Sequence, residues 1–307
     1  MDASLLYKTQ TRKLFHAHIK LKLSAFVDDS IFDEFYAAME EVNAGYNSYV
    51  DGSFLDQINR QAGFFVDTNP ITVNLLTQVK NLSDDLAGEY DITIMPLLRL
   101  WGFYDKYDWT IPDPVSIAEA KQKVNYQSIQ INGLKIKIET GQEITTGSFL
   151  KAYAVDAAVG RIKQAGISDA IVNAGGSTIF AINNEVHPTW QVAVNDPETK
   201  KPLFLLRIAN QCYSTSSNEN TYLELDGKRY GHIISPKTGY PTENRQVGIV
   251  SRDAFTGDVL STGLFNFDKD TFTEKINFLS AKYGIEGFMT DKNGETVFSE
   301  NFEKYIC

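Results

Sequence analysis

Residues 212–265 are the stretch that most constrains the fold of this chain, because strand, hairpin and helix signals follow one another there directly. Three hydroxyl residues, Thr215-Ser216-Ser217, end a segment of strand-like composition. The pair Asp226-Gly227 is suited to the type I′ turn of a β-hairpin. The apolar run that contains Asp258 and Thr262 is typical of a helix. We therefore expect the rest of the chain to be arranged around this stretch.

Asp258 and Thr262 are the candidate metal ligands of the predicted helix. Residues four apart lie one turn apart on the same helix face, so their oxygens can face one ion. Carboxylate and hydroxyl oxygens are hard ligands, which suit Mg²⁺ better than a soft metal. The alternative is a local hydrogen bond between the aspartate and the threonine, which the same spacing also allows.

Two further segments predict strands. Residues 127–138 carry the clearest hairpin signal of the chain, with two alternating arms around an Asn132-Gly133 turn. Residues 14–23 alternate strictly between apolar and polar side chains, which predicts one half-buried strand. Its polar face includes His16 and His18, which we interpret as solvent-exposed residues and not as metal ligands, because no third ligand lies nearby.

Three helices are predicted. One begins at Ser30, a candidate N-cap, a second begins with Pro70 in its first position, and a third spans residues 146–165. Strand and helix signals are mixed and do not alternate as in βαβ units. The sequence therefore predicts an α+β fold with largely antiparallel sheets and flanking helices. A length of 307 residues suits one large domain or two closely fused ones.

Composition excludes several classes of function. The net charge of −10 argues against a nucleic-acid-binding protein that neutralises phosphates. The two cysteines, Cys212 and Cys307, indicate no disulfide framework. No stretch approaches the roughly 20 apolar residues of a membrane span. The first residues lack the apolar core of a signal peptide, so we expect a cytoplasmic protein unless a native leader has been removed.

A family resemblance rests on two motifs of the 212–265 stretch. The segment H-I-I-S-P-K-T-G-Y-P at 232–241 resembles H-I-I-D-P-R-T-G-x-P of the ApbE-type FAD:protein FMN transferases. In that family an A-D-A-L-A-T helix follows, and here G-D-V-L-S-T occupies 257–262. Two separated motifs in the right order are far more specific than either alone, and weaker similarities extend the resemblance over most of the chain.

The resemblance implies a fold and an activity. The fold would be the ApbE-like, or T-fold-like, architecture, with residues 1–307 forming a single domain, or two fused lobes with the FAD site between them. The activity would be Mg²⁺-dependent transfer of FMN from FAD to a Thr or Ser hydroxyl of a partner flavoprotein, with release of AMP. FAD would then be a substrate and Mg²⁺ the metal cofactor.

The resemblance also implies roles for individual residues. Those expected to bind FAD are Tyr49, Tyr90, Asp91, Thr145, Lys151, Thr215, Ser216 and His232. Those expected to hold Mg²⁺ are Asp258, Thr262 and a main-chain oxygen at Ser148. His232, a residue type suited to acid–base work, and Asp258 are the catalytic candidates. Without the family, Tyr49 is an ordinary aromatic, Asp91 a local cap of a buried loop and His232 a hydrogen-bonded strand histidine.

Several positions depart from the family pattern. Thr145 stands where the family has an aspartate, Ser148 where it has a glycine and Phe54 where it has a glutamate. Ser235 and Lys237 replace an aspartate and an arginine. Two alternatives therefore accompany the transferase: an FAD pyrophosphatase that yields FMN and AMP, and a non-catalytic FAD-binding protein. The retained Asp and Thr of the predicted helix favour an enzyme, because a binding protein has less use for a metal site.

Overall fold

The structure is a computed structural model that describes residues 6–104, 110–218 and 221–307. Residues 1–5, part of the start searched for a signal peptide, lie outside the described residues. The helices are α1 (Ser30–Tyr46), α2 (Phe54–Arg60), α3 (Pro70–Asp85), α4 (Met95–Leu100), α5 (Pro114–Lys121), α6 (Leu150–Gln164), α7 (Ala254–Leu264) and α8 (Lys269–Tyr283), with 3₁₀ turns at Tyr126–Ser128 and Phe302–Tyr305.

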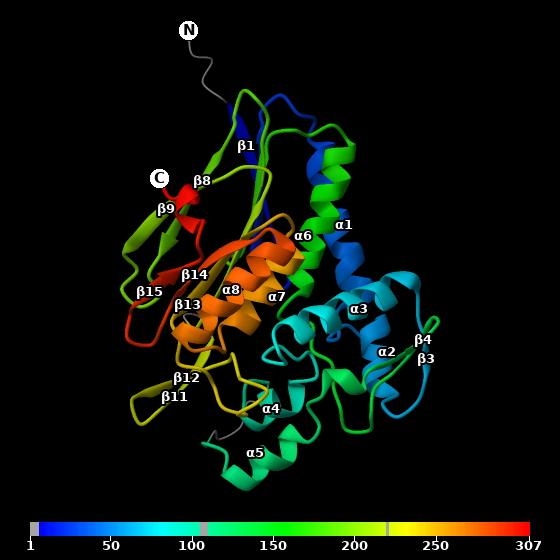
Figure 1. Ribbon diagram of the computed structural model, residues 1–307. Coiled ribbons are helices and arrows are strands. Elements are labelled where there is room, and N and C mark those ends of the chain that lie inside the picture. Colours follow the sequence, from blue (N-terminus) through cyan, green and yellow to red (C-terminus); the bar gives the residue numbers. More distant parts are fainter. Residues whose placement is uncertain (1–5, 105–109, 219–220) are drawn as a thin grey trace.

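An antiparallel sheet of eight strands runs through the molecule in the order β1-β2-β6-β7-β10-β13-β14-β15 (Figure 1). Two hairpins, β11–β12 and β8–β9, and a small sheet in the order β3-β5-β4 complete the strand set. The strands are β1 (Tyr7–Leu14), β2 (Ala17–Ser24), β3 (Val66–Asp67), β4 (Gln130–Asn132), β5 (Lys135–Lys137), β6 (Ala170–Ala174), β7 (Thr178–Ile182), β8 (Trp190–Asn195), β9 (Pro202–Ile208), β10 (Cys212–Ser217), β11 (Tyr222–Leu225), β12 (Lys228–Gly231), β13 (Gln246–Ser251), β14 (Glu286–Thr290) and β15 (Thr296–Phe298).

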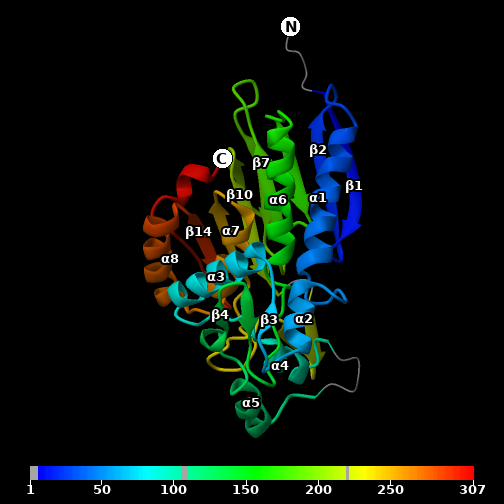
Figure 2. The same cartoon turned by 90° about the vertical axis from the view of Figure 1, so that its right-hand side faces the viewer.

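The large sheet is covered on both faces, which explains its apolar strands. Helices α1, α6, α7 and α8 lie over one face (Figure 2), and the β8–β9 hairpin lies over the other. Strand β7 illustrates the consequence: Phe180 and Ile182 join the core under the helices, whereas Ile179 and Ala181 join the core under the hairpin. Every strand pair of the described chain is antiparallel, so the predicted α+β class with antiparallel sheets is confirmed.

The strand predicted at 14–23 is wrong at its start. Phe15 and His16 form the turn between β1 and β2, with φ of 51° and 57°. Turns of this kind favour Gly and Asn, so neither residue predicts one. Beyond the turn the alternation is confirmed, because Ile19, Leu21 and Leu23 are fully buried.

The two predicted hairpin turns differ in outcome. Asp226 and Gly227 both have positive φ and join the paired residues of β11 and β12, as a type I′ turn requires. The Asn132-Gly133 prediction is off by one residue, because Asn132 pairs with Lys135 and the turn is Gly133-Leu134. Only Gly133 has a positive φ there, which matches a type II′ turn with glycine in its first central position.

Two predicted helix starts are also corrected. Ser30 is already the first residue of α1, and its N–H donates to the carboxylate of Asp28. The helix predicted from Thr146 begins only at Leu150, because Phe149 directly before it has a non-helical φ of −147°. The residues before α6 are therefore a loop, which leaves them free to line a cavity. Cys212 and Cys307 are free thiols, as expected.

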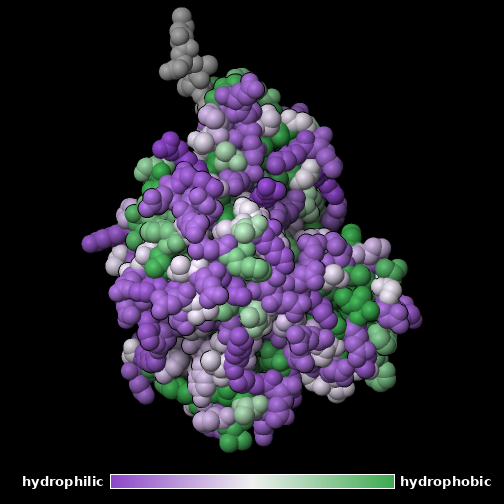
Figure 3. All heavy atoms as spheres, in the orientation of Figure 1, coloured by the Kyte–Doolittle hydropathy of each residue, from purple (hydrophilic) through white to green (hydrophobic). Residues whose placement is uncertain are grey.

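The small sheet and helices α2 to α5 lie beside one end of the large sheet (Figure 1). This part of the molecule exposes large apolar side chains, including Phe64, Phe65 and Leu134 around the small sheet. The hydropathy surface shows the resulting hydrophobic area on the right-hand side, within a mostly hydrophilic face (Figure 3). Among the described residues no helix is both long and apolar enough to cross a membrane.

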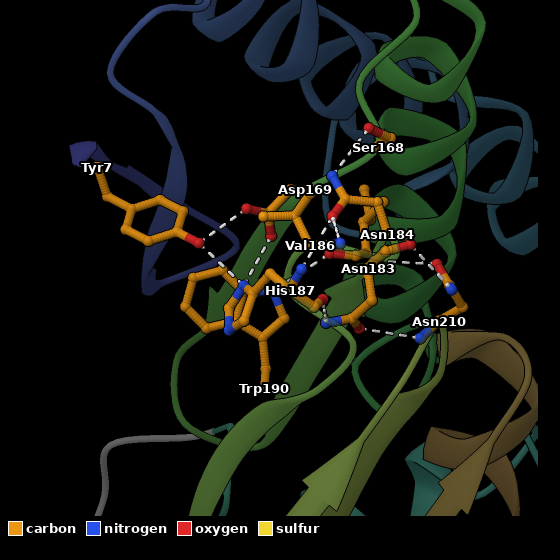
Figure 4. A network of polar contacts seen from close by, with 10 residues as sticks. Tyr7, Ser168, Asp169, Asn183, Asn184, Val186, His187, Trp190 and Asn210 are labelled. Carbon is orange, nitrogen blue, oxygen red and sulfur yellow. Dashed lines mark hydrogen bonds and ion pairs between the residues drawn. The ribbon is translucent and has the colours of Figure 1, made fainter. Parts of the chain in front are cut away.

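A polar network joins the start of β1 to Asp169, directly before β6, and to His187 of the segment between β7 and β8 (Figure 4). The Tyr7 hydroxyl donates to Asp169 Oδ2 at 2.7 Å, and Nδ1 of His187 lies 2.9 Å from the same hydroxyl and 3.0 Å from Asp169 Oδ1. The His187 ring stands edge-on to Trp190, with centroids 4.3 Å apart. The carboxylate can only accept, so the tyrosine and the histidine each supply a proton.

We predict that Tyr7→Phe lowers the free energy of unfolding by about 1–2 kcal/mol, because it removes a hydrogen bond to a carboxylate that is mostly shielded from water. Urea denaturation measures the change. Tyr240→Phe is the matched control, since no described residue binds the hydroxyl of this exposed tyrosine. Equal stability of the two variants would show that the network does not hold β1 in place.

Candidate active site

A cavity of about 490 Å³ opens where α6, α7, the end of β10 and the segment before α4 meet. Every residue predicted for FAD or metal binding lines this cavity except Tyr49. The lining set contains Tyr90, Asp91, Thr145, Ser148, Lys151, Thr215, Ser216, His232, Asp258 and Thr262. The fold therefore brings together positions that are up to 172 residues apart in the chain, from Tyr90 to Thr262.

Asp258 is one of the carboxylates that line the cavity. It lies on the second turn of α7 and is 8% exposed, and no described residue donates a hydrogen bond to its carboxylate. Burial raises the pKa of Asp258 to about 6, while the nearby Lys151 charge opposes that rise. A buried carboxylate without a donor is costly unless something else balances it. Its environment is therefore that of a ligand-binding acid.

Thr262 lies one turn beyond Asp258, as the spacing predicts. Its hydroxyl donates to the main-chain oxygen of Asp258 at 3.0 Å, and Ser216 Oγ lies 3.2 Å from it. Ser216 also lies 2.8 Å from Ser261 Oγ, so it joins the end of β10 to α7. The alternative of a local hydrogen bond between the aspartate and the threonine is thus confirmed, but this bond goes to the main-chain carbonyl of Asp258 and leaves its carboxylate without a donor.

His232 follows the β11–β12 hairpin and has a defined tautomer. Its Nδ1 lies 3.0 Å from the Thr221 carbonyl oxygen, which can only accept, so Nδ1 carries the proton. Nε2 is therefore the unprotonated nitrogen. Burial lowers the pKa of His232, which keeps the ring neutral near pH 7. A neutral imidazole with one free lone pair can accept a proton from a reacting group.

Lys151 contributes a fixed positive charge. Its ammonium donates to Ala174 O at 3.2 Å, Ser177 Oγ at 2.8 Å and Thr178 Oγ1 at 2.6 Å. These bonds use all three of its protons on the β6–β7 turn. Lys151 therefore lies in the cavity wall as a positioned charge and ties the start of α6 to that turn.

Tyr49 lies just outside the cavity lining. Its hydroxyl is 2.6 Å from Thr145 Oγ1, which does line the cavity, and 2.8 Å from the Tyr104 hydroxyl. The Tyr49 and Tyr104 rings are stacked, with centroids 5.6 Å apart and planes 16° apart. Thr145, where the family resemblance places an aspartate, thus holds the tyrosine through a neutral hydrogen bond.

Tyr90 and Asp91 have different surroundings. The Tyr90 hydroxyl lies 2.8 Å from Ser148 Oγ, so it binds the loop before α6. Asp91 accepts from Thr93 N and Oγ1, both at 2.7 Å, and from Tyr126 N at 2.8 Å. Both of its oxygens are thereby used within the protein, as in the alternative of a local cap. The role of Asp91 toward FAD stays a prediction.

Glu89 is a cavity residue that our reading of the sequence missed. Its carboxylate accepts from Ser235 Oγ at 2.7 Å, and Lys237 Nζ lies 3.7 Å away. Ser235 and Lys237 are the two positions of the 232–241 segment that depart from the family pattern. Glu89 adjoins the quoted Tyr90-Asp91 pair, but only the fold reveals its contact with Ser235, 146 residues further along.

The Asp258 carboxylate and the Thr262 hydroxyl are hard oxygen donors, which suit Mg²⁺ better than a softer metal. Within the described ranges no three His, Cys, Asp or Glu side chains converge on one point. Mg²⁺ does not need such a group, because it keeps water ligands and is bound by one or two carboxylates together with substrate phosphates. Asp258, without a donor and beside the Thr262 hydroxyl, offers a site of that kind.

Comparison with known proteins agrees with the motifs. The sequence model of the ApbE family matches residues 15–287. The FAD:protein FMN transferase of Klebsiella pneumoniae (strain 342) is 30% identical over 251 residues, which cover 76% of this chain and 69% of that protein. The FAD:protein FMN transferase of Haemophilus influenzae is 27% identical over 288 residues, covering 89% of this chain and 82% of that protein.

Solved structures show the same fold. The ApbE protein of Thermotoga maritima superposes with a TM-score of 0.89 at 23% identity and covers 97% of this chain and 99% of its own. The apo form of the Pseudomonas stutzeri flavinyl transferase ApbE superposes with a TM-score of 0.86 at 22% identity, covering 99% and 98%. The predicted ApbE-like architecture is thereby confirmed, and this chain belongs to the ApbE family.

Proposed function

We propose that this protein transfers FMN from FAD to a Thr or Ser hydroxyl of a partner flavoprotein. The observation that carries the proposal is the buried Asp258 carboxylate, which has no donor among the described residues and shares one cavity with the free Nε2 of His232. The names of the curated relatives support flavin transfer. A cavity of about 490 Å³ lies within the range of small-molecule sites.

The transfer exchanges the phosphoanhydride bond of FAD for a phosphoester bond to the acceptor. The acceptor oxygen forms a bond to the FMN phosphorus, and the bond from that phosphorus to the bridging oxygen breaks. The bridging oxygen leaves with AMP, and the hydroxyl proton passes to a base. The chemistry therefore needs negative charge to be neutralised, a nucleophile in line and a proton acceptor.

The residues of the cavity match these needs. Asp258 and Thr262 would hold Mg²⁺, with the main chain at Ser148 as a further ligand. When bound, the ion supplies Lewis-acid neutralisation of the pyrophosphate charge. His232 Nε2 takes the acceptor's proton, while Lys151 adds a fixed positive charge to the wall. Ser216 keeps Thr262 in place through its hydroxyl.

Incubating the protein with FAD and MgCl₂, with and without a flavoprotein that carries an acceptor hydroxyl, tests the proposal. We expect AMP together with an FMN adduct on the acceptor, detected by mass spectrometry. AMP with free FMN and no adduct would instead establish an FAD pyrophosphatase. FAD binding without AMP in either mixture would establish a non-catalytic FAD-binding protein.

Tyr49 provides a prediction about FAD affinity. If its ring lies against the flavin, Tyr49→Ala should weaken FAD binding about fivefold, because aromatic stacking contributes about 1 kcal/mol beyond burial. Tyr49→Phe keeps the ring and loses only the hydroxyl's bonds to Thr145 and Tyr104, so it should bind FAD nearly as the wild type does. Fluorescence titration measures both. Wild-type affinity in the alanine variant would remove Tyr49 from the site.

A further inference from the structure

Asp156 is a carboxylate outside the predicted site that contacts the helix carrying Asp258. It lies on α6, and its two oxygens accept from Ala254 N at 2.7 Å and Phe255 N at 2.8 Å. These are the first two residues of α7. Helix α7 already has its own cap, because Asp253 accepts from Thr256 N at 2.7 Å. The second carboxylate therefore joins two helices and does not merely end one.

The contact belongs to a larger joint between α6 and α7, which lie side by side in both ribbon views (Figures 1 and 2). The rings of Phe149 and Tyr153 each stand edge-on to Phe255, with centroids 5.9 Å away. Phe149 and Tyr153 flank Lys151 in the sequence, whereas Phe255 lies three residues before Asp258. The joint thus connects the two walls of the cavity.

The free-energy cost of burying the ionised Asp156 carboxylate argues for a role other than stabilising the fold. Burial, followed by repulsion from Asp253 and Asp258, raises the pKa of Asp156 to about 7 despite its two main-chain donors. Because the folded pKa lies above the unfolded one, this group lowers stability as the pH rises from about 4 to 7. A buried acid whose ionisation the fold opposes, and whose two oxygens join α6 to the start of α7, is a candidate for a functional role.

We propose that Asp156 is a positioning residue, which holds the first turn of α7 against α6 and thereby sets the distance between Asp258 and the wall that carries Lys151 and Ser148. The proposal rests on the proposed function, since it assigns Asp156 to the geometry of that same site. Displacements of about 1 Å in a catalytic arrangement can lower a rate by about 100-fold, so such a joint has a measurable effect.

The test compares Asp156→Asn and Asp156→Ala with the control Asp253→Ala. Asparagine keeps the shape of the side chain, but its NH₂ group cannot accept a hydrogen bond. One of the two bonds from the N–H groups of Ala254 and Phe255 is therefore lost. For Asp156→Asn we expect the MgCl₂ concentration at half-maximal melting shift, measured with saturating FAD, to rise about 10- to 100-fold. AMP release should fall by a similar factor, while the melting temperature without metal stays level or rises. Asp156→Ala, if it folds, should show the same rise in the MgCl₂ midpoint and the same fall in AMP release.

Asp253→Ala removes a cap of the same helix, so it should lower the melting temperature without changing the MgCl₂ midpoint. The proposal is overturned if Asp156→Asn keeps the wild-type midpoint and rate. It is equally overturned if the midpoint falls, because the carboxylate would then act on Asp258 through charge repulsion. Failure of the wild type to release AMP or to respond to MgCl₂ would contradict the proposed function instead.

Discussion

Replacing Asp258 with asparagine should lower the rate of AMP release by on the order of 10³-fold while the fold remains intact. The amide keeps the shape of the side chain but lacks the charge that would hold the metal. Metal ions contribute several kcal/mol to charge stabilisation in such reactions, and about 4 kcal/mol corresponds to a factor of 10³. Single-turnover assays of AMP release at pH 7.5, where the carboxylate of the wild type is ionised, measure the effect.

Without metal, Asp258→Asn should be as stable as the wild type or more stable. The pKa of Asp258 is raised to about 6 in the folded protein, so the wild type loses stability as the pH rises from about 4 to 6. That loss amounts to roughly 3 kcal/mol. Asp258→Asn should not show it, and its free energy of unfolding above pH 6 should equal or exceed that of the wild type.

Magnesium completes this test. The melting temperature of the wild type should rise with MgCl₂ by mass action, and that of Asp258→Asn should not. Asp258→Glu is the matched control, since it keeps the charge and should retain part of the magnesium response. If Asp258→Asn keeps both its turnover and its melting shift, the metal lies elsewhere and the aspartate is only a buried residue of α7.

The fold class could be predicted from local signals, because a hairpin signal in the sequence predicts two antiparallel strands. The Asp226-Gly227 turn is specified by its own two residues and was placed correctly. The Phe15-His16 turn was missed, because tertiary pairing of β1 with β2 imposes positive φ on residues that disfavour it. The start of α6 was misplaced for a similar reason: the loop before Leu150 is held by long-range contacts, such as Tyr90 to Ser148.

The candidate site could be predicted mainly from family motifs and less from spacing. Spacing alone linked Asp258 with Thr262, and left open whether they bind each other or an ion. Glu89 and Asp156 were not predicted, since their partners lie 146 and 98 residues further along the chain. A periodic pattern of apolar residues carries no information on contacts between residues so far apart in the chain. Residues that line the cavity were thus recognised more readily than those whose contacts connect its walls.

Replacing His232 with glutamine should lower FMN transfer by about 10²- to 10⁴-fold, the range expected for loss of a general base. Glutamine can still donate toward the Thr221 carbonyl but cannot take up a proton from the acceptor. The rate of FMN transfer should fall, whereas the affinity for FAD should change much less. His187→Gln is the matched control, because this histidine lies in the network around Tyr7 and does not line the cavity.

The pH dependence separates a base from a binding residue. Burial lowers the pKa of His232, so the neutral ring persists below the usual pH range of histidine. The transfer rate of the wild type should therefore rise along an acid limb centred below pH 6.5 and then level off. At saturating MgCl₂, which keeps Asp258 ionised, that limb should disappear in His232→Gln, because the titrating nitrogen is gone. A variant that keeps the acid limb at a uniformly lower rate would show that His232 only binds FAD and that the proton goes to another group.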